Sequence, residues 1–164
     1  YDKNAPNNTT PADFAERLGL AAGRPLLIIP CSGTCATLGE RVLVAWKAGR
    51  ESVRAVNDAL PILKRAKKIS IVSVGSFGHH DRAAEGSGHQ LCAHLAHHQV
   101  AAEHEQILAT GLPIAELLLD NARNQNVDLI VMGGYAQTRR GGYVLGPVAA
   151  YLLTHMTIPI LLSH

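Results

Sequence analysis

The residues best suited to chemistry include a glycine-rich stretch with two adjacent arginines. The stretch from Gly133 to Gly142 reads GGYAQTRRGG. Glycines allow the backbone to approach a phosphate closely, and Arg139 and Arg140 would supply charged hydrogen bonds to it. This pattern is typical of an anion-binding loop. The alternative is a solvated loop that binds nothing.

Histidines form the second candidate group. The chain has nine, and His94 and His98 have the spacing of a metal-binding helix face, with His97 beside them and His79 and His80 upstream. No carboxylate or cysteine stands at a typical metal-ligand spacing. Surface histidines are therefore the simpler interpretation, and metal binding is kept as an alternative.

The cysteines and hydroxyl residues do not form a recognisable catalytic motif. Cys31 and Cys35 are separated by three residues, whereas redox and zinc motifs use two, and Cys92 suits a buried helix position. Three cysteines are too few for a disulfide scaffold, so reduced thiols are expected. Because there is also no Gly-x-Ser-x-Gly elbow, the sequence predicts no enzyme activity.

Length and composition set the class of protein. The chain has 164 residues, of which 47% are hydrophobic and 17% charged, as in one globular domain. A net charge of +2 argues against nucleic acid or an anionic membrane as partner, and the longest apolar run, 25–30, is far short of a membrane span. A polar N-terminus without a signal sequence predicts a cytoplasmic location. Because Tyr1 is not methionine, we expect that an upstream portion has been removed.

Short apolar runs alternate with amphipathic segments, which is typical of βαβ units. Strands are predicted at 25–30, 42–46, 69–74, 103–108, 129–132 and 159–162, and helices at 12–22, 51–66, 88–98, 113–124 and 147–155. Pro61 should kink the second helix. From residue 41 the alternating order predicts a doubly wound α/β sheet, with any ligand at the carboxyl ends of its strands.

The first helix and strand have the same layout as the last ones. Both segments read as a helix, a short loop, a proline and an apolar strand, with Pro25 and Pro159 in matching places. The similarity is short, so chance is one explanation. The other is that residues 12–30 are the end of a preceding, related domain.

These segments resemble the universal stress protein family, and in particular the second domain of its tandem members. The runs that carry the resemblance are Arg41–Trp46, Arg50–Ser52, Ala59–Pro61, Leu91–Val100, Asp128–Gly133 and Leu145–Pro159. The resemblance implies a five-stranded parallel sheet of the adenine nucleotide alpha hydrolase-like, Rossmann-like kind, with an extra N-terminal helix and strand here. It also implies a role in the stress response and ATP binding without obvious turnover. Residues 1–40 would be the tail of a first domain and a linker, and 41–164 the second domain.

The family's nucleotide signature is Gly, two residues, Gly, nine residues, Gly and then Ser or Thr, with an Asp closing the first strand. Gly133 and Gly146 match it, but Ala136 stands at the second glycine, Pro147 at the hydroxyl position and Lys47 at the Asp. Each departure removes a contact to the nucleotide. The resemblance therefore implies a degenerate ATP site with weak or absent binding and no required cofactor.

The resemblance assigns candidate nucleotide contacts residue by residue, and it assigns no metal ligand. They are Ala45, Trp46, Lys47, Val72, Val74, Met132, Gly133, Gly134, Tyr135, Ala136, Arg139, Gly146, Pro147 and Val148. The rival interpretation is a structural dimerisation module that binds no nucleotide.

The resemblance also implies a partner at the last strand, which in this family pairs antiparallel with its counterpart in a homodimer or a tandem domain. Residues Leu26–Ile29 carry no charge that would protect a free sheet edge. They are therefore predicted to pair with Ile160–Leu162, within the chain or from another copy.

Overall fold

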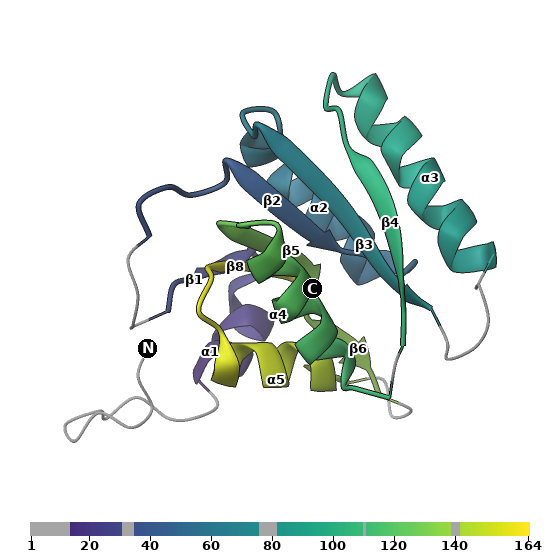
Figure 1. The fold of residues 1–164 in the computed structure, drawn as a ribbon. Helices are drawn as coiled ribbons and strands as arrows, with labels where there is room; N and C mark the ends of the chain where they lie inside the picture. Colours follow the sequence, from purple (N-terminus) through teal and green to yellow (C-terminus); the bar gives the residue numbers. More distant parts are fainter. Residues whose placement is uncertain (1–13, 31–34, 76–81, 110, 139–141) are drawn as a thin grey trace.

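The computed structural model describes residues 14–30, 35–75, 82–109, 111–138 and 142–164 (Figure 1). Along the chain the elements are α1 (Phe14–Ala22), β1 (Leu26–Ile28), β2 (Arg41–Ala45), α2 (Arg50–Leu63), β3 (Lys68–Gly75), α3 (Arg82–His97), β4 (Glu103–Leu108), α4 (Ile114–Asn124), β5 (Leu129–Gly133), β6 (Tyr135–Gln137), β7 (Tyr143–Leu145), α5 (Pro147–His155) and β8 (Ile160–Ser163). None of the helices described is long and apolar enough to cross a membrane.

The main sheet has six strands in the order β1-β8-β5-β2-β3-β4. Strands β8, β5, β2, β3 and β4 are parallel to one another, and β1 runs antiparallel to β8. The predicted doubly wound sheet of five parallel strands with an extra N-terminal helix and strand is confirmed. The order places β5 and β2, which come from distant parts of the chain, side by side at the centre.

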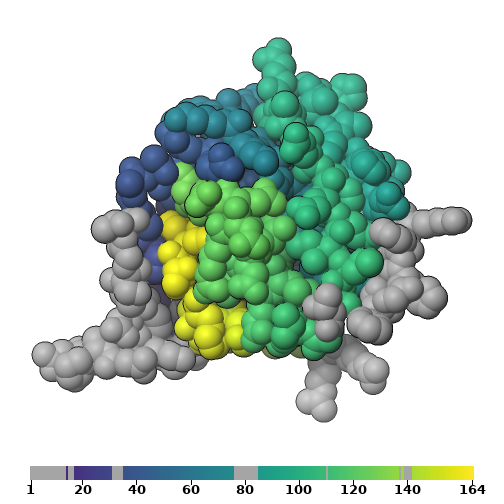
Figure 2. All heavy atoms as spheres, viewed as in Figure 1, coloured from purple at the N-terminus to yellow at the C-terminus, as the bar shows by residue number. Residues whose placement is uncertain are grey.

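Two apolar layers hold the helices against the sheet. One, with Val44, Leu63 and Leu95 at its centre, lies beneath α2 and α3, and the other, with Leu43 and Leu152, lies beneath α4 and α5. The central strands are buried on both faces, as strands of parallel sheets are. Each fully buried aliphatic side chain contributes about 1.5–3 kcal/mol, so these layers dominate the stability of the fold. In Figure 2, side chains of α4 and α5 cover the face of the sheet nearest the viewer.

Three elements differ most from the sequence prediction, and the strand predicted at 25–30 is the shorter β1, Leu26–Ile28. Helix α3 begins at Arg82 and not at 88, because the glycines expected to form a loop are accommodated in the helix, and Gly88 lies directly over the ring of His104. Helix α2 ends at Leu63, so Pro61 lies in its last turn, where its missing N–H removes one hydrogen bond near the helix end. The stretch predicted as a glycine-rich loop contains a two-stranded antiparallel sheet, β6–β7.

The N-terminal segment pairs with the last strand of the same chain, as predicted. The register joins Leu26 to Leu162, Leu27 to Leu161 and Ile28 to Ile160. The edge of β8 that would pair with a second copy is therefore occupied by β1. The predicted start of the first helix at 12 lies outside the described residues.

Candidate functional site

The candidate site lies where β2 and β5 end. Ala45, the last residue of β2, is paired with Met132 of β5. Beyond them the chain continues into Lys47 on one side and into the β6–β7 hairpin on the other, and it re-enters the core through α5. This is the edge of a doubly wound sheet at which ligands bind.

Most of the predicted apolar contacts come together on one face of the sheet. They belong to, or pack against, the layer beneath α4 and α5: Ala45, Val72, Val74, Met132, Tyr135 and Val148. Trp46 lies on the opposite face, in the layer beneath α2 and α3. Its indole Nε1–H donates a hydrogen bond of 3.0 Å to Oγ of Ser87 on α3. The structure thus separates Trp46 from the other candidates.

Gly133 and Gly134 are required by packing alone. A Cβ on Gly133 would lie 2.7 Å from the carbonyl carbon of Glu51 and 2.8 Å from the nitrogen of Ser52, so the end of β5 abuts the first turn of α2. A Cβ on Gly134 would overlap the side chain of Leu162 in β8. Both glycines would be needed here even if no ligand bound.

Two backbone donors at the ends of the hairpin, those of Gly134 and Gly146, already have partners within the protein. The N–H of Gly134 donates to the carbonyl of Ser163 at 2.9 Å, and the N–H of Gly146 donates to the carbonyl of Gly134 at 2.8 Å. Pro147 occupies the first position of α5 and has no N–H. Three backbone positions of the signature region therefore have no donor to offer a phosphate in this conformation.

The hairpin that follows Gly134 is closed by backbone hydrogen bonds, and the side chain of Tyr135 anchors its base. Residues 135, 136 and 137 pair with 145, 144 and 143, and the N–H of Thr138 donates to the carbonyl of Gly142 at 2.7 Å. Tyr135 is buried, and its ring lies against Gly19 of α1 at a place where a Cβ would overlap it. Ala136 is exposed, and Arg139 and Arg140 lie outside the described residues.

Sequence reasoning missed the aromatic contacts around the base of the hairpin. The ring of His164 lies 5.5 Å from the ring of Tyr135 and 6.2 Å from that of Tyr143, edge-on in both cases. The Tyr143 hydroxyl accepts a hydrogen bond of 3.3 Å from Nη1 of Arg50 on α2. The alternation of Tyr143 and Leu145 around an exposed Val144 is the two-residue period of a strand, and it could have predicted β7.

Lys47 is an exposed cation just beyond β2, close in sequence to the start of α2. The sequence matched it to the aspartate of the signature. With its positive charge it can contact a phosphate or a carboxylate, but it cannot accept hydrogen bonds from a ribose.

A hollow of about 280 Å³ lies between α2 and α3, on the Trp46 side of the sheet. Its lining includes Trp46, Val53, Ser87 and His94. Its volume is near the lower limit for pockets that bind small molecules. None of the other candidate nucleotide contacts lines it.

The described histidine and cysteine candidates do not form a metal site. His94 and His98 meet edge-on with ring centroids 4.9 Å apart, but the described residues contain no group of three or more metal-ligating side chains. Burial raises the pKa of the Cys92 thiol, against a backbone hydrogen bond that lowers it, so Cys92 is a weak nucleophile. His79, His80 and Cys31 lie outside the described residues.

The strand order and the helices on both faces of the sheet define a doubly wound α/β protein. The model of the universal stress protein family matches residues 39–164. The chain therefore belongs to that family.

Solved structures of universal stress proteins share this fold. One from Archaeoglobus fulgidus has a TM-score of 0.60 at 17% identity, with 74% of this chain and 96% of that chain covered. One from Burkholderia pseudomallei has a TM-score of 0.57 at 23% identity, with 80% and 98% covered. One from Archaeoglobus fulgidus DSM 4304 has a TM-score of 0.62 at 18% identity, with 85% of this chain but 49% of that chain covered. No curated protein matches the chain.

Proposed function

We propose that this chain is a regulatory and binding module of the stress response whose nucleotide site is degenerate, with weak ATP binding and no hydrolysis. The observation that carries the proposal is the internal pairing of the Gly134 and Gly146 N–H groups. A phosphate-binding loop needs donors that point at the ligand. Here the N–H group of Gly146 is used to close the hairpin, and that of Gly134 is used to join the hairpin to β8.

The side chains at the site support the same conclusion. Pro147 supplies neither an N–H nor a hydroxyl, and Lys47 removes the carboxylate expected to hold the adenosine end. A hydrogen bond to a charged group contributes about 1.5–3 kcal/mol, so two or three losses remove roughly 3–6 kcal/mol. A micromolar site, at about −8 kcal/mol, would then bind in the millimolar range. Contacts from Lys47, Arg139 and Arg140 to phosphate would restore part of this.

Titration calorimetry with Mg-ATP tests the proposal. We expect a dissociation constant weaker than about 100 μM and no release of phosphate. The combined variant K47D, A136G and P147S should bind at least tenfold more tightly. Lys64→Asp, at an exposed lysine just after α2, is the charge-matched control and should leave binding unchanged. Low-micromolar binding by the unaltered chain would overturn the proposal.

The second candidate is a structural module that binds no nucleotide. It is favoured by the pairing of β1 with β8, which places an interaction element on the last strand. If even the triple variant gives no heat with Mg-ATP while remaining folded, this candidate replaces the first. For either function we propose the cytoplasm as the compartment, where the thiols would remain reduced.

A further inference from the structure

The hollow between α2 and α3 brings core side chains to the surface of the protein. Val56, Leu91 and Trp46 line it, and they are only 1%, 6% and 8% exposed. All three belong to the apolar layer beneath these two helices. Val53, one turn before Val56 on α2, also lines the hollow and is 47% exposed. The hollow is therefore an apolar opening into that layer, with Val53 at its rim.

Trp46 is held in place at the base of this hollow. Its backbone N–H donates to the carbonyl of Val72 at 2.8 Å, which extends the pairing of β2 with β3 by one residue. Its indole N–H donates to Oγ of Ser87 at 3.0 Å, so both ends of the residue are fixed. A side chain that is already ordered loses little conformational entropy when a ligand packs against it. The indole ring is therefore a preformed surface for a second aromatic ring.

The lining of the hollow favours an uncharged ligand. None of the ten described residues that line it is Lys, Arg, Asp or Glu. A charged ligand would lose its hydration there without gaining an ion pair. The polar groups at the hollow include the side-chain amides of Asn57 and Gln90, both at exposed residues. Nδ2 of Asn57 donates to the carbonyl of Val53 at 2.9 Å, and its Oδ1 can accept a hydrogen bond from a ligand.

The volume of the hollow limits the size of the ligand. A cavity of about 150 Å³ lined by aliphatic and aromatic side chains binds one molecule of benzene. The hollow, at about 280 Å³, is close to twice as large. It lies below the range of about 300–1,000 Å³ that is usual for pockets with drug-sized ligands. A molecule of two fused rings therefore suits it.

We propose that this hollow binds a small, uncharged aromatic molecule that has two fused rings and one hydrogen-bond donor. The rings pack on Trp46 and against Val53 and Leu91, and the donor is within reach of the amide oxygens of Asn57 and Gln90. The proposed site lies on the face of the sheet opposite the other apolar candidates for nucleotide contact. The inference does not depend on nucleotide binding, and each can fail without the other.

Indole is a suitable probe, because it has two fused rings, no charge and one N–H group. Trp46 is the only tryptophan in the sequence, so isotope-labelled protein gives a single indole N–H signal in its nitrogen–proton NMR spectrum. Titration with indole should shift this signal saturably, with half-saturation below about 1 mM. Indole carboxylate, an anionic relative of the same shape, should require at least a tenfold higher concentration.

A pair of variants places the binding in the hollow. Val53→Asp adds a carboxylate at the rim and should weaken indole binding at least tenfold. Leu112→Asp, at a side chain that is 49% exposed and does not line the hollow, is the control and should leave indole binding unchanged. Because both positions are exposed, both variants should fold, and the dispersion of the other NMR signals checks this.

Three results would overturn the inference. One is the absence of a saturable shift of the Trp46 signal, or equal indole binding by the Val53→Asp and Leu112→Asp variants. Another is competition between indole and Mg-ATP, because the hollow would then belong to the nucleotide site. The third is a Trp46 signal that moves with protein concentration alone in the unaltered chain but not in Val53→Asp, because a second copy would then occupy the hollow.

Discussion

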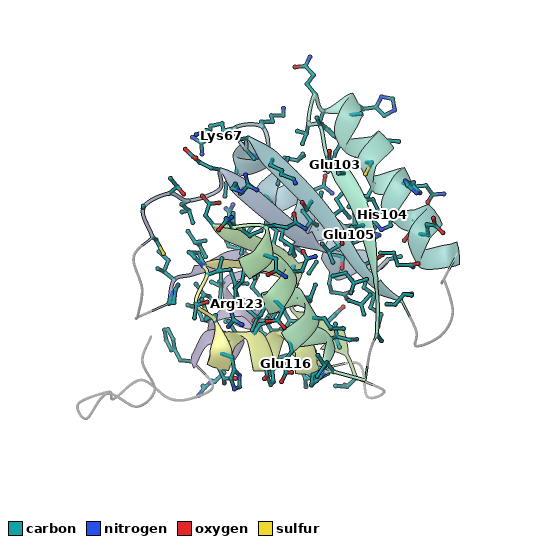
Figure 3. The ribbon with its side chains drawn as sticks, viewed as in Figure 1. Lys67, Glu103, His104, Glu105, Glu116 and Arg123 are labelled. Carbon is teal, nitrogen blue, oxygen red and sulfur yellow. The ribbon has the colours of Figure 1, made fainter. Side chains whose placement is uncertain are left out.

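Oγ of Ser73 and Nε2 of His104 share a hydrogen bond of 2.9 Å that joins β3 to β4 beneath α3. Ser73 is buried, and Gly88 of α3 leaves room for the imidazole, which Figure 3 shows on β4 beside that helix. Burial and the charge of His89 lower the pKa of His104, and Glu85 and Glu105 raise it in part. The net shift is downward, so the folded protein favours the neutral ring.

This pair predicts a loss of stability in mild acid. The pKa of His104 in the folded protein lies below its unfolded value of about 6.5. The contribution of the neutral ring to the stability of the fold is therefore fully present above that pH, and it is lost as pH falls through the folded pKa. Urea unfolding at a series of pH values from neutral to mildly acidic should show this slope. His104→Gln should reduce the slope. An unchanged slope in His104→Gln would contradict the prediction.

Of the carboxylates at the entry to β2, Asp128 should be the one whose removal lowers the free energy of unfolding most. Its oxygens accept the N–H groups of Gly39, Glu40 and Arg41 at 3.1, 3.1 and 2.9 Å. Burial raises the pKa of Asp128, but hydrogen bonds from the Thr37 hydroxyl and these N–H groups together hold it below its usual range. The contribution of the ionised Asp128 to stability is therefore fully present above its unfolded pKa of about 3.9. It is lost as pH falls below that value and through the lower, folded pKa.

Replacement of Asp128 by alanine leaves the three N–H groups and the Thr37 hydroxyl without their acceptor. We expect a loss of about 1–3 kcal/mol in the free energy of unfolding. Asp120→Ala, which breaks an exposed pair with Arg123 on α4, should cost no more than about 0.5 kcal/mol. Chemical denaturation at neutral pH would measure both, and equal costs would argue against the role of Asp128.

Gly133→Ala should destabilise the protein in the absence of any ligand. The new Cβ would lie 2.7 and 2.8 Å from backbone atoms of Glu51 and Ser52, which cannot move without shifting α2. We expect a cost of about 1–3 kcal/mol, as for other overpacked sites. Gly86→Ala is the control, because a Cβ there meets nothing within 4 Å and alanine favours a helix. An unchanged melting temperature in Gly133→Ala would show that β5 and α2 are further apart than in this structure.

Deletion of Tyr1–Pro30 should expose the edge of β8. The residues Ile160–Ser163 are all buried, and the deletion would leave their backbone groups and apolar side chains open to another copy. Aggregation or a new dimer is expected in sedimentation velocity. A monomer with unchanged solubility would contradict this role of β1.

The double variant His94→Gln and His98→Gln tests the histidine alternative. His94 is exposed and His98 is half-buried on the surface of α3, and the two replacements together should change stability by no more than about 0.5 kcal/mol. Added zinc should leave the melting temperature of both proteins unchanged. A zinc-dependent rise that the double variant loses would establish a metal site on α3.

The sequence by itself determined the elements and the class of fold. The apolar run 129–132 and the amphipathic pattern of 113–124 report local burial, because the two-residue and near-four-residue periods follow from backbone geometry alone. The helix 147–155 was predicted with the bounds that the structure has, since Pro147 suits a first helical position. The glycine signature and its departures could likewise be read directly from the residues.

The state of the site was decided only by tertiary structure. Periodicity does not specify that Gly133 meets the backbone of Glu51, nor that the N–H of Gly134 is used by Ser163, because these contacts join segments far apart in the chain. That Trp46 and Ala45 point to opposite faces follows from strand alternation alone, whereas the helices that cover each face are set by packing. Local patterns specify which residues are buried, whereas the partners of each donor depend on how strands and helices pack together.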